Sequence, residues 1–316
     1  MNIIEISKKY NTQVKCLDLL EKLRWGKSVK CTFCGSDKTR RAKNEAGRYA
    51  CRNCKNTFSI LSDTIFEGTK LPLPKWFLSI ATILNGKGGV SSKELQRNIG
   101  LTYKTAYYVS MRIRVGMLIE NTHLHGILEM DESYFGGKPK KFGSKTNKAL
   151  LSSVSQKRGR GTSKISVAGI VERKGEVKTK VIEKLTKRNL LAMLKKYVVE
   201  DDSVLVTDTF KSYSNLNEYI EHLQINHSKQ FSKGLTHINT IEGYWAFVKN
   251  GIRGSYKSIS PKYLPFYLIE YEWHYNHRND KNQFMAFLQN ALNQEKELLY
   301  WKAETSEKVK HVAYKN

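Results

Sequence analysis

Three acidic residues that are far apart in the sequence stand at the ends of expected secondary-structure elements. Asp131 and Asp208 each follow a short, largely apolar run, in ILEMD and SVLVTD, that is typical of a buried strand. Glu242 opens a helical stretch, and Lys249 follows it two helical turns later on the same face. Three carboxylates at one place repel one another unless a cation lies between them. If the fold gathers them, these residues predict a site for hard divalent metal ions.

Each of the three acids also has an ordinary structural explanation. Asp131 could cap a turn, and Asp208 could cap a helix. Glu242 could simply favour the positive end of a helix dipole. The alternatives to Asp131 as a ligand are the flanking acids Glu129 and Glu132, of which Glu129 shares its strand face and Glu132 does not. The position of all three acids at element ends favours one shared site over three separate caps.

Four of the five cysteines form two local pairs, in CTFC (Cys31 and Cys34) and CRNC (Cys51 and Cys54). The spacing within and between the pairs is typical of a four-cysteine zinc site. Redox dithiols are the alternative, but one pair would suffice for them, and it would open a helix in a thioredoxin-like unit. We therefore expect one structural zinc ion, and a closed shell without catalytic role. The fifth cysteine, Cys16, is expected in the core.

The chain is strongly basic. It has 54 Lys and Arg residues against 29 Asp and Glu, a formal net charge of +25. Such an excess indicates a polyanionic partner, and nucleic acid is the usual one. A membrane surface is the competing polyanion, but there is no run of apolar residues long enough to span a bilayer and no signal peptide. We therefore expect a cytoplasmic protein with no membrane partner.

Composition and periodicity divide the chain into segments. We expect a helical lead-in, a zinc ribbon, a helical DNA-binding segment, a mixed catalytic domain and a basic tail, at residues 1–26, 27–68, 69–122, 123–295 and 296–316 respectively.

The segment 69–122 predicts three helices. Ser91 and Glu94 form a capping box at the start of the second helix, Gly100 ends it, and Thr102 can cap the third. This pattern fits helix-turn-helix geometry, in which the last helix enters a DNA groove. The alternative is a helical spacer whose aromatic residues pack in a small core. The third helix carries Tyr103, Lys104, Tyr107, Arg112 and Arg114.

The domain at 123–295 alternates strands and helices. The predicted order is strand, hairpin, helix, strand, helix, strand, helix, and the hairpin turns at Lys174-Gly175. This order predicts an α/β fold, namely a ribonuclease-H-like mixed sheet with flanking helices. The expected elements lie at 127–130, 165–171, 177–182, 189–199, 203–206, around Ile225, 240–249 and 264–277.

Four stretches together resemble a known family: CTFC…CRNC, MDESYFGGK, VTDTFKSY and HINTIEGYWAFVKNGIRGSY. They are similar to the bacterial insertion-sequence DDE transposases of the ISXO-like group, which join a zinc ribbon to a ribonuclease-H-like catalytic domain. The likeness runs from about residue 20 to about residue 290. It implies that Asp131, Asp208 and Glu242 are the catalytic acids. The third position is sometimes Asn in this family, and Asn239 lies on the same helical face. The spacing to Lys249 assigns Glu242 as the ligand.

The resemblance implies a transposase that cuts and joins DNA at the ends of its own mobile element. The three acids would hold two Mg²⁺ ions, or Mn²⁺, for in-line displacement at phosphorus. The implied partners are double-stranded DNA, both terminal inverted repeats and target, and a second copy of the chain on paired ends. The protein would work in the bacterial cytoplasm, on the nucleoid when bound. DNA contacts are expected from Lys249, Arg112, Lys104 and Arg253.

Two other functions use the same features. A non-catalytic DNA-binding regulator, descended from a transposase, would keep the ribbon and helices but not the chemistry. The intact acidic set and Lys249 argue against it. A metal-dependent DNA nuclease, such as a Holliday-junction enzyme, would share the metal chemistry without strand transfer. Inverted repeats flanking the coding region would indicate a mobile element.

Overall fold

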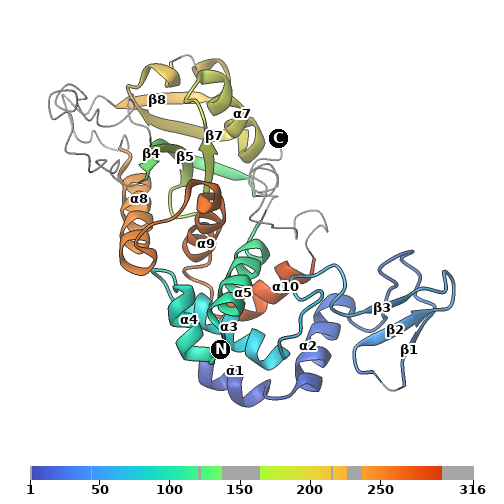
Figure 1. Cartoon of the computed structure of the whole chain (residues 1–316). Coiled ribbons are helices and arrows are strands. Elements are labelled where there is room, and N and C mark those ends of the chain that lie inside the picture. Colours follow the sequence, from blue (N-terminus) through green and yellow to red (C-terminus); the bar gives the residue numbers. More distant parts are fainter. Residues whose placement is uncertain are drawn as a thin grey trace, which may run out of the picture. The chain divides into compact units, whose positions relative to one another are not determined.

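The structure is a computed structural model of the 316-residue chain, and its described part forms two compact units (Figure 1). The N-terminal unit contains the described residues before position 120, together with 248–256 and 265–293. The sheet unit contains the described residues between 122 and 247, together with 257–264. The expected basic tail at 296–316 lies outside the described residues, which are 2–43, 45–119, 122–136, 164–214, 216–225 and 237–293.

The sheet unit is built on five strands in the order β6-β5-β4-β7-β8. The central strand β4 pairs antiparallel with β5 and parallel with β7. The edge strands follow the same division, because β6 is antiparallel to β5 and β8 is parallel to β7. This confirms the predicted α/β fold with a mixed sheet. The strands are β4 (Leu124–Phe135), β5 (Ile165–Glu172), β6 (Val177–Ile182), β7 (Val198–Asp208) and β8 (Glu221–Ile225).

Helices α7 (Lys187–Tyr197) and α8 (Asn239–Gly251) cover the sheet (Figure 1). Side chains alternate between the two faces along each strand. One face packs with α7 in a core to which β4 gives Leu128 and Met130. The opposite face receives α8: a Cβ added at Gly169 of β5 would lie 2.7 Å from the Trp245 ring. Residues of β4 with odd numbers, such as Asp131, therefore face α8.

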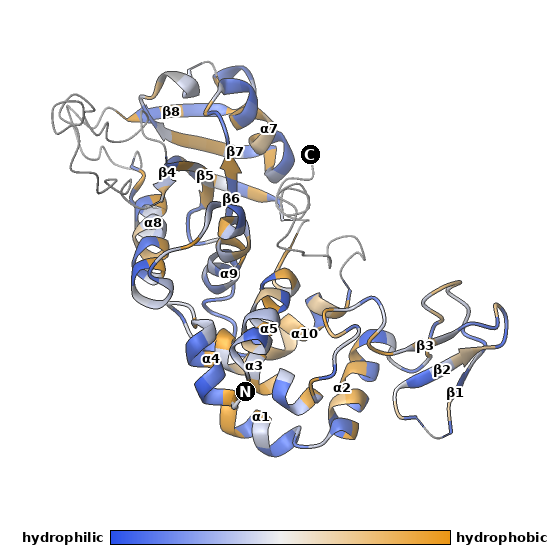
Figure 2. Cartoon of the chain, viewed as in Figure 1, coloured by the Kyte–Doolittle hydropathy of each residue, from blue (hydrophilic) through white to orange (hydrophobic). Residues whose placement is uncertain are grey.

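The N-terminal unit begins with two helices, α1 (Ile3–Lys9) and α2 (Gln13–Trp25), followed by a three-stranded antiparallel ribbon. Figure 2 shows apolar and polar residues alternating around α2, as expected for a helix with one buried face. Cys16 of α2 is fully buried, which confirms its expected place in the core, and burial raises its thiol pKa to about 12. The ribbon strands are β1 (Thr39–Arg41), β2 (Arg48–Cys51) and β3 (Thr57–Ser59).

Three helices follow the ribbon, as the sequence predicts: α3 (Leu73–Asn85), α4 (Ser92–Ile99) and α5 (Tyr103–Gly116). The Ser91 hydroxyl accepts a hydrogen bond from the Glu94 N–H at the start of α4. Thr102 caps α5 in the same way. The intervening Gly100 has φ 67°, the left-handed conformation that ends a helix. The predicted helix boundaries around this turn are thus confirmed.

The end of the described chain packs with the N-terminal unit. Helices α9 (Leu264–Asn276) and α10 (Gln283–Leu292) were expected in the catalytic domain at 123–295. Instead, α10 buries its apolar face against α2, α3 and α5, and Phe284 contacts the rings of Tyr10 and Phe77. Because of these contacts, α10 belongs to the N-terminal unit although it follows the sheet unit in the sequence.

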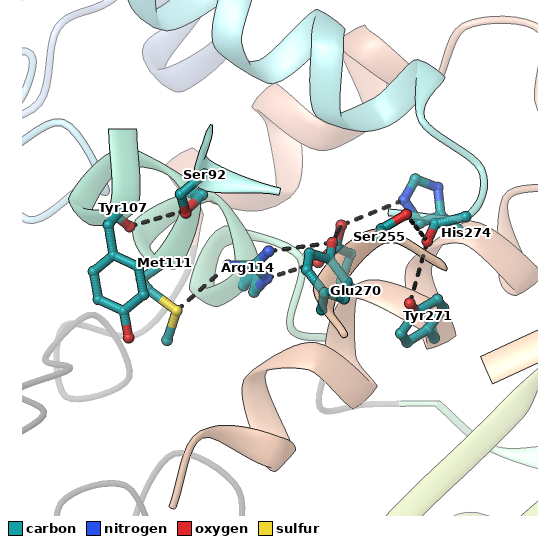
Figure 3. A network of polar contacts seen from close by, with 11 residues as sticks. Ser92, Tyr107, Met111, Arg114, Ser255, Glu270, Tyr271 and His274 are labelled. Carbon is teal, nitrogen blue, oxygen red and sulfur yellow. Dashed lines mark hydrogen bonds and ion pairs between the residues drawn. The ribbon is translucent and has the colours of Figure 1, made fainter. Parts of the chain in front are cut away.

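A buried ion pair joins α5 to α9 inside the N-terminal unit (Figure 3). The Arg114 guanidinium donates to Glu270 at 2.6 Å, and both side chains are almost completely excluded from solvent. Glu270 also accepts from the Tyr256 hydroxyl, and the Arg114 guanidinium lies over the Tyr267 ring. The expectation that Arg114 belongs to a DNA-facing helix surface is corrected here, because its charge is used in the core.

One smaller difference concerns the connection between β7 and β8. The helix expected between β7 and β8 is replaced by two 3-10 turns, Lys211–Tyr213 and Leu216–Glu218. In the described part of the chain, helices are too short or too polar to cross a membrane.

Candidate metal centres

The four paired cysteines come together at the ribbon. The Cys31 and Cys54 sulfurs are 3.7 Å apart, as are those of Cys34 and Cys51. All four sulfurs lie within 4.8 Å of one another. Cys51 ends β2, whereas the other three stand in turns beside the ribbon strands. Four sulfurs this close form a complete ligand set for one ion.

The chemistry around the sulfurs suits zinc. The backbone N–H groups of Cys54 and Asn53 point at the Cys51 sulfur and lower its thiol pKa to about 7. Gly35, with φ 70°, makes the first knuckle turn, and its N–H bonds the Cys31 carbonyl at 2.9 Å. Zinc takes deprotonated thiolates in tetrahedral geometry. The donor set therefore fits one structural zinc ion with no position left for substrate.

The sheet unit places Asp131 and Asp208 on neighbouring strands. β4 and β7 run parallel, and Glu129 stands opposite Val206 in their register. Continuing that register by two residues on each strand sets Asp131 beside Asp208, with both side chains on the α8 face. Asp208 also accepts a hydrogen bond from the Phe210 N–H at 3.0 Å, which fixes the end of β7.

Glu242 reaches the same neighbourhood from the first turn of α8, where its side chain is exposed. The pKa of Asp131 reports the proximity of the acids. Burial, together with the negative charges of Glu132, Asp208 and Glu242, raises that pKa to about 7. Within the described part of the chain, only the four cysteines bring three or more such ligand atoms within 4.8 Å. The three carboxylates thus lie within electrostatic range but are not closed into a single shell.

Sequence reasoning missed the role of Glu129, which is completely buried. Its carboxylate accepts hydrogen bonds from the backbone N–H groups of Thr240 and Ile241, at the start of α8. Arg173 pairs with it at 2.6 Å. The sequence offered one signal of this role. An acid on the same strand face as Asp131 points into the fold, where its negative charge needs a partner. The sequence does not say which element provides it.

The residues expected to contact DNA occupy different surroundings. Lys104 and Arg253 are exposed, whereas Lys249 is partly buried near the end of α8. The Arg112 guanidinium donates to the backbone carbonyls of Thr64 and Glu67, at 2.9 and 3.2 Å. Arg112 therefore ties α5 to the segment that follows the ribbon, and a DNA contact by it stays a prediction.

Two protein families match the regions just described. The ISXO2-like transposase domain matches residues 123–276, and the transposase zinc-ribbon domain matches residues 11–57. An uncharacterized transposase-like protein of Haemophilus influenzae is 32% identical over 117 residues, which cover 37% of this chain and 94% of that protein. The chain belongs to the ISXO2-like transposase family. The ISXO2-like match contains all three acids and Lys249, and the zinc-ribbon match contains all four cysteines.

A more distant relative comes from another transposable element. An uncharacterized protein in transposable element ISH50, from Halobacterium salinarum, is 24% identical over 273 residues, which cover 84% of this chain and 91% of that protein. Among solved structures, a pre-cleavage Mos1 transpososome matches with 12% identity and a TM-score of 0.26, covering 74% of this ISXO2-like chain and 78% of the other. A TM-score this low does not establish a shared fold.

Proposed function

We propose that this ISXO2-like protein cuts and joins DNA at the ends of its own mobile element. Asp131, Asp208 and Glu242 are the catalytic acids of this proposal. The observation that supports it best is electrostatic: Asp131 and Asp208 end up side by side on the α8 face, and the charges of Asp208 and Glu242 contribute to raising the pKa of Asp131 to about 7. A site in which carboxylates repel one another is a site that a divalent cation stabilises.

The three acids would hold two Mg²⁺ ions, or Mn²⁺ in their place, because carboxylate oxygens are the ligands these hard ions take. Bound there, the ions would lower the pKa of the attacking water or 3′-hydroxyl and stabilise the leaving oxygen. The chain's part is to aim the carboxylates: β4 and β7 fix two of them, and α8 fixes the third. Glu242 is exposed, so the site is open to a DNA phosphate.

DNA is the proposed substrate and partner. The formal net charge of +25 supports a polyanion, and α4 and α5 supply an element of helix-turn-helix type. Exposed groups at the start of α5 include Lys104 and the Tyr103 ring, over which Lys93 lies at 4.7 Å. Lys249 and Arg253, after Glu242 in the chain, would meet phosphates close to the acids. Joining two ends implies two copies of the chain on paired DNA ends.

The test uses purified full-length protein, Mg²⁺ and a DNA duplex carrying the inverted repeats of the element. Wild-type protein should nick the repeat end and join it to target DNA. Asp131→Asn and Asp208→Asn should bind the duplex as wild type does but lose cleavage. Full Mg²⁺-dependent cleavage by either variant would refute the assignment of the acids. Hydrolysis without joined products would make the protein a nuclease instead.

A further inference from the structure

The completely buried carboxylate of Glu129 stands at the edge of the proposed active site. It lies two residues before Asp131 on β4 and faces the same side of the sheet. A buried carboxylate is unfavourable unless it is paired and hydrogen-bonded. The positions of its partners therefore indicate what this buried charge does.

The partners of Glu129 are at the start of α8. One carboxylate oxygen accepts from the backbone N–H groups of Thr240 and Ile241, at 2.8 and 3.0 Å. The other accepts from the Thr240 hydroxyl at 2.9 Å. The first N–H groups of a helix have no partner within the helix, and an acceptor with negative charge is favoured there.

The start of α8 lacks a cap of its own. The Ile238 carbonyl accepts the first helical hydrogen bond, from the Glu242 N–H at 3.2 Å. Ile238 thus takes the capping position, where a side-chain oxygen normally bonds the N–H groups two and three residues on. An isoleucine side chain has no such oxygen. Glu129 supplies the missing cap from a strand more than a hundred residues earlier in the sequence.

Arg173 completes this arrangement from the turn between β5 and β6. Its Nε donates to Glu129 at 2.6 Å, and its Nη2 donates to the His237 carbonyl at 2.7 Å. Its own backbone N–H donates to the Ile127 carbonyl of β4 at 3.0 Å. One guanidinium therefore neutralises the cap and holds the backbone of His237, two residues before the start of α8.

We infer that Glu129 and Arg173 are positioning residues for the metal-binding acids, because they fix the start of α8, and so Glu242, against the strand that carries Asp131. The inference rests on the proposed function. Glu242 directly follows Ile241, whose N–H Glu129 binds, and Asp131 is two residues from Glu129. Mg²⁺ demands near-ideal octahedral geometry, so a small shift of α8 is enough to spoil the site.

The experiment measures Mn²⁺ binding by calorimetry on the full-length, zinc-loaded protein, alongside the Mg²⁺ concentration that gives half-maximal DNA cleavage. Glu129→Gln keeps the shape of the side chain but removes its charge. It should weaken Mn²⁺ binding and raise the Mg²⁺ midpoint by about 10–100-fold, the usual effect of losing a residue that orients metal ligands. Arg173→Lys keeps the positive charge, but a lysine ammonium lacks the forked guanidinium that binds both the Glu129 carboxylate and the His237 carbonyl. It should weaken Mn²⁺ binding and raise the Mg²⁺ midpoint by a smaller factor than Glu129→Gln does.

The matched control is Glu270→Gln in the N-terminal unit. Glu270 is equally buried and pairs with Arg114 at the same 2.6 Å (Figure 3), and it belongs to the N-terminal unit, whereas the proposed catalytic acids belong to the sheet unit. It should lower the melting temperature and leave Mn²⁺ binding unchanged. If Glu129→Gln and Arg173→Lys also lower only the melting temperature, the two residues merely stabilise the fold and the inference is wrong.

Asp131→Asn separates this result from a failure of the proposed function. If Asp131→Asn leaves Mn²⁺ binding and cleavage intact, the proposed acids are wrong and the positioning role falls with them. If Asp131→Asn abolishes Mn²⁺ binding while Glu129→Gln does not weaken it, the proposed function stands and only the positioning role is lost.

Discussion

The two candidate metal centres differ in how the chain assembles them. The four cysteines lie within residues 31–54, and their sulfurs are already within 4.8 Å of one another. The three acids come from two strands and a helix, between residues 131 and 242, and they are less tightly gathered. The first centre is local, closed and suited to holding a small ribbon together. The second is assembled by the whole sheet unit and stays open, as a site for substrate must.

The two centres also differ in what shifts the pKa values of their ligands. Backbone N–H groups lower the pKa of the Cys51 thiol to about 7, which favours the thiolate that zinc binds. Burial and neighbouring negative charge raise the pKa of Asp131 to about the same value. Neighbouring ligands repel one another at both centres, since burial and the other sulfurs raise the pKa of Cys54 to about 11, but the cysteine site adds backbone donors that favour the Cys51 thiolate. A closed four-thiolate shell is structural, whereas a buried acid with a raised pKa is typical of a catalytic site.

The largest effect is expected from removing a zinc ligand. Cys51→Ser should lose about one tightly bound zinc ion per chain and unfold the ribbon, because structural zinc contributes about 10–16 kcal/mol in small zinc domains. Metal analysis and circular dichroism of the purified protein measure both. Cys16→Ala changes a buried cysteine that is not a ligand and should keep the zinc. A ribbon that stays folded without zinc would remove the distinction between the two centres.

The second effect exchanges the ligand type at the open centre. Glu242→Cys should cut Mg²⁺-dependent cleavage by a factor on the order of 10³, equivalent to several kcal/mol of lost metal stabilisation. Mn²⁺ should restore part of the rate, because it accepts a soft thiolate better than Mg²⁺ does. Cleavage rates in the two metals measure this.

Glu242→Gln is the control for this exchange, since it removes the charge without offering a thiolate and should recover less in Mn²⁺. Equal rates for Glu242→Cys and wild type in Mg²⁺ would show that Glu242 is not a ligand, and Asn239 would then be the next residue to change.

The same contrast explains what the sequence could predict. The zinc ligands were readable because their spacing within two short motifs defines the site. The hairpin at Lys174-Gly175 and the cap at Ser91 were also predicted, because each depends on neighbouring residues alone. The order of strands and helices along the sheet unit was predicted as well, apart from the helix expected between β7 and β8. These predictions succeeded because they depend on residues that are close in the sequence or on the order of elements along the chain.

Long-range pairings were beyond such rules. Glu129 looked like an alternative ligand, because strand alternation gives its face but not its partner at the start of α8. Arg114 belongs to the helix expected to enter a DNA groove, and nothing nearby in the sequence indicates that Glu270 neutralises it in the core. Placing α10 with the N-terminal unit depends on Phe284 meeting Tyr10 and Phe77. Each miss involves a contact between residues separated by more than a hundred positions in the sequence.

The smallest expected effect is on how the stability of the N-terminal unit depends on pH. This dependence is separate from protonation of the three carboxylates in the sheet unit. His274 of α9 is buried, and burial lowers its pKa, although Glu270 at 4.0 Å acts in the opposite direction. The positive charge of Arg114 and the neighbouring His277 also lower it. An unfolded chain takes up this proton near pH 6.5, whereas the folded chain resists it.

The sign follows from that difference in protons bound. His274 leaves stability intact above pH 6.5 and reduces it as the pH falls toward the lowered folded pKa, by at most about 1.4 kcal/mol per pH unit for one proton. His274→Leu should therefore flatten the fall in unfolding free energy between pH 7 and pH 5, measured by urea unfolding. His123→Gln, at an exposed histidine, should leave the slope as it is. If His274→Leu keeps the full slope, the acid sensitivity arises from other groups, such as the partly buried His222, whose pKa burial also lowers.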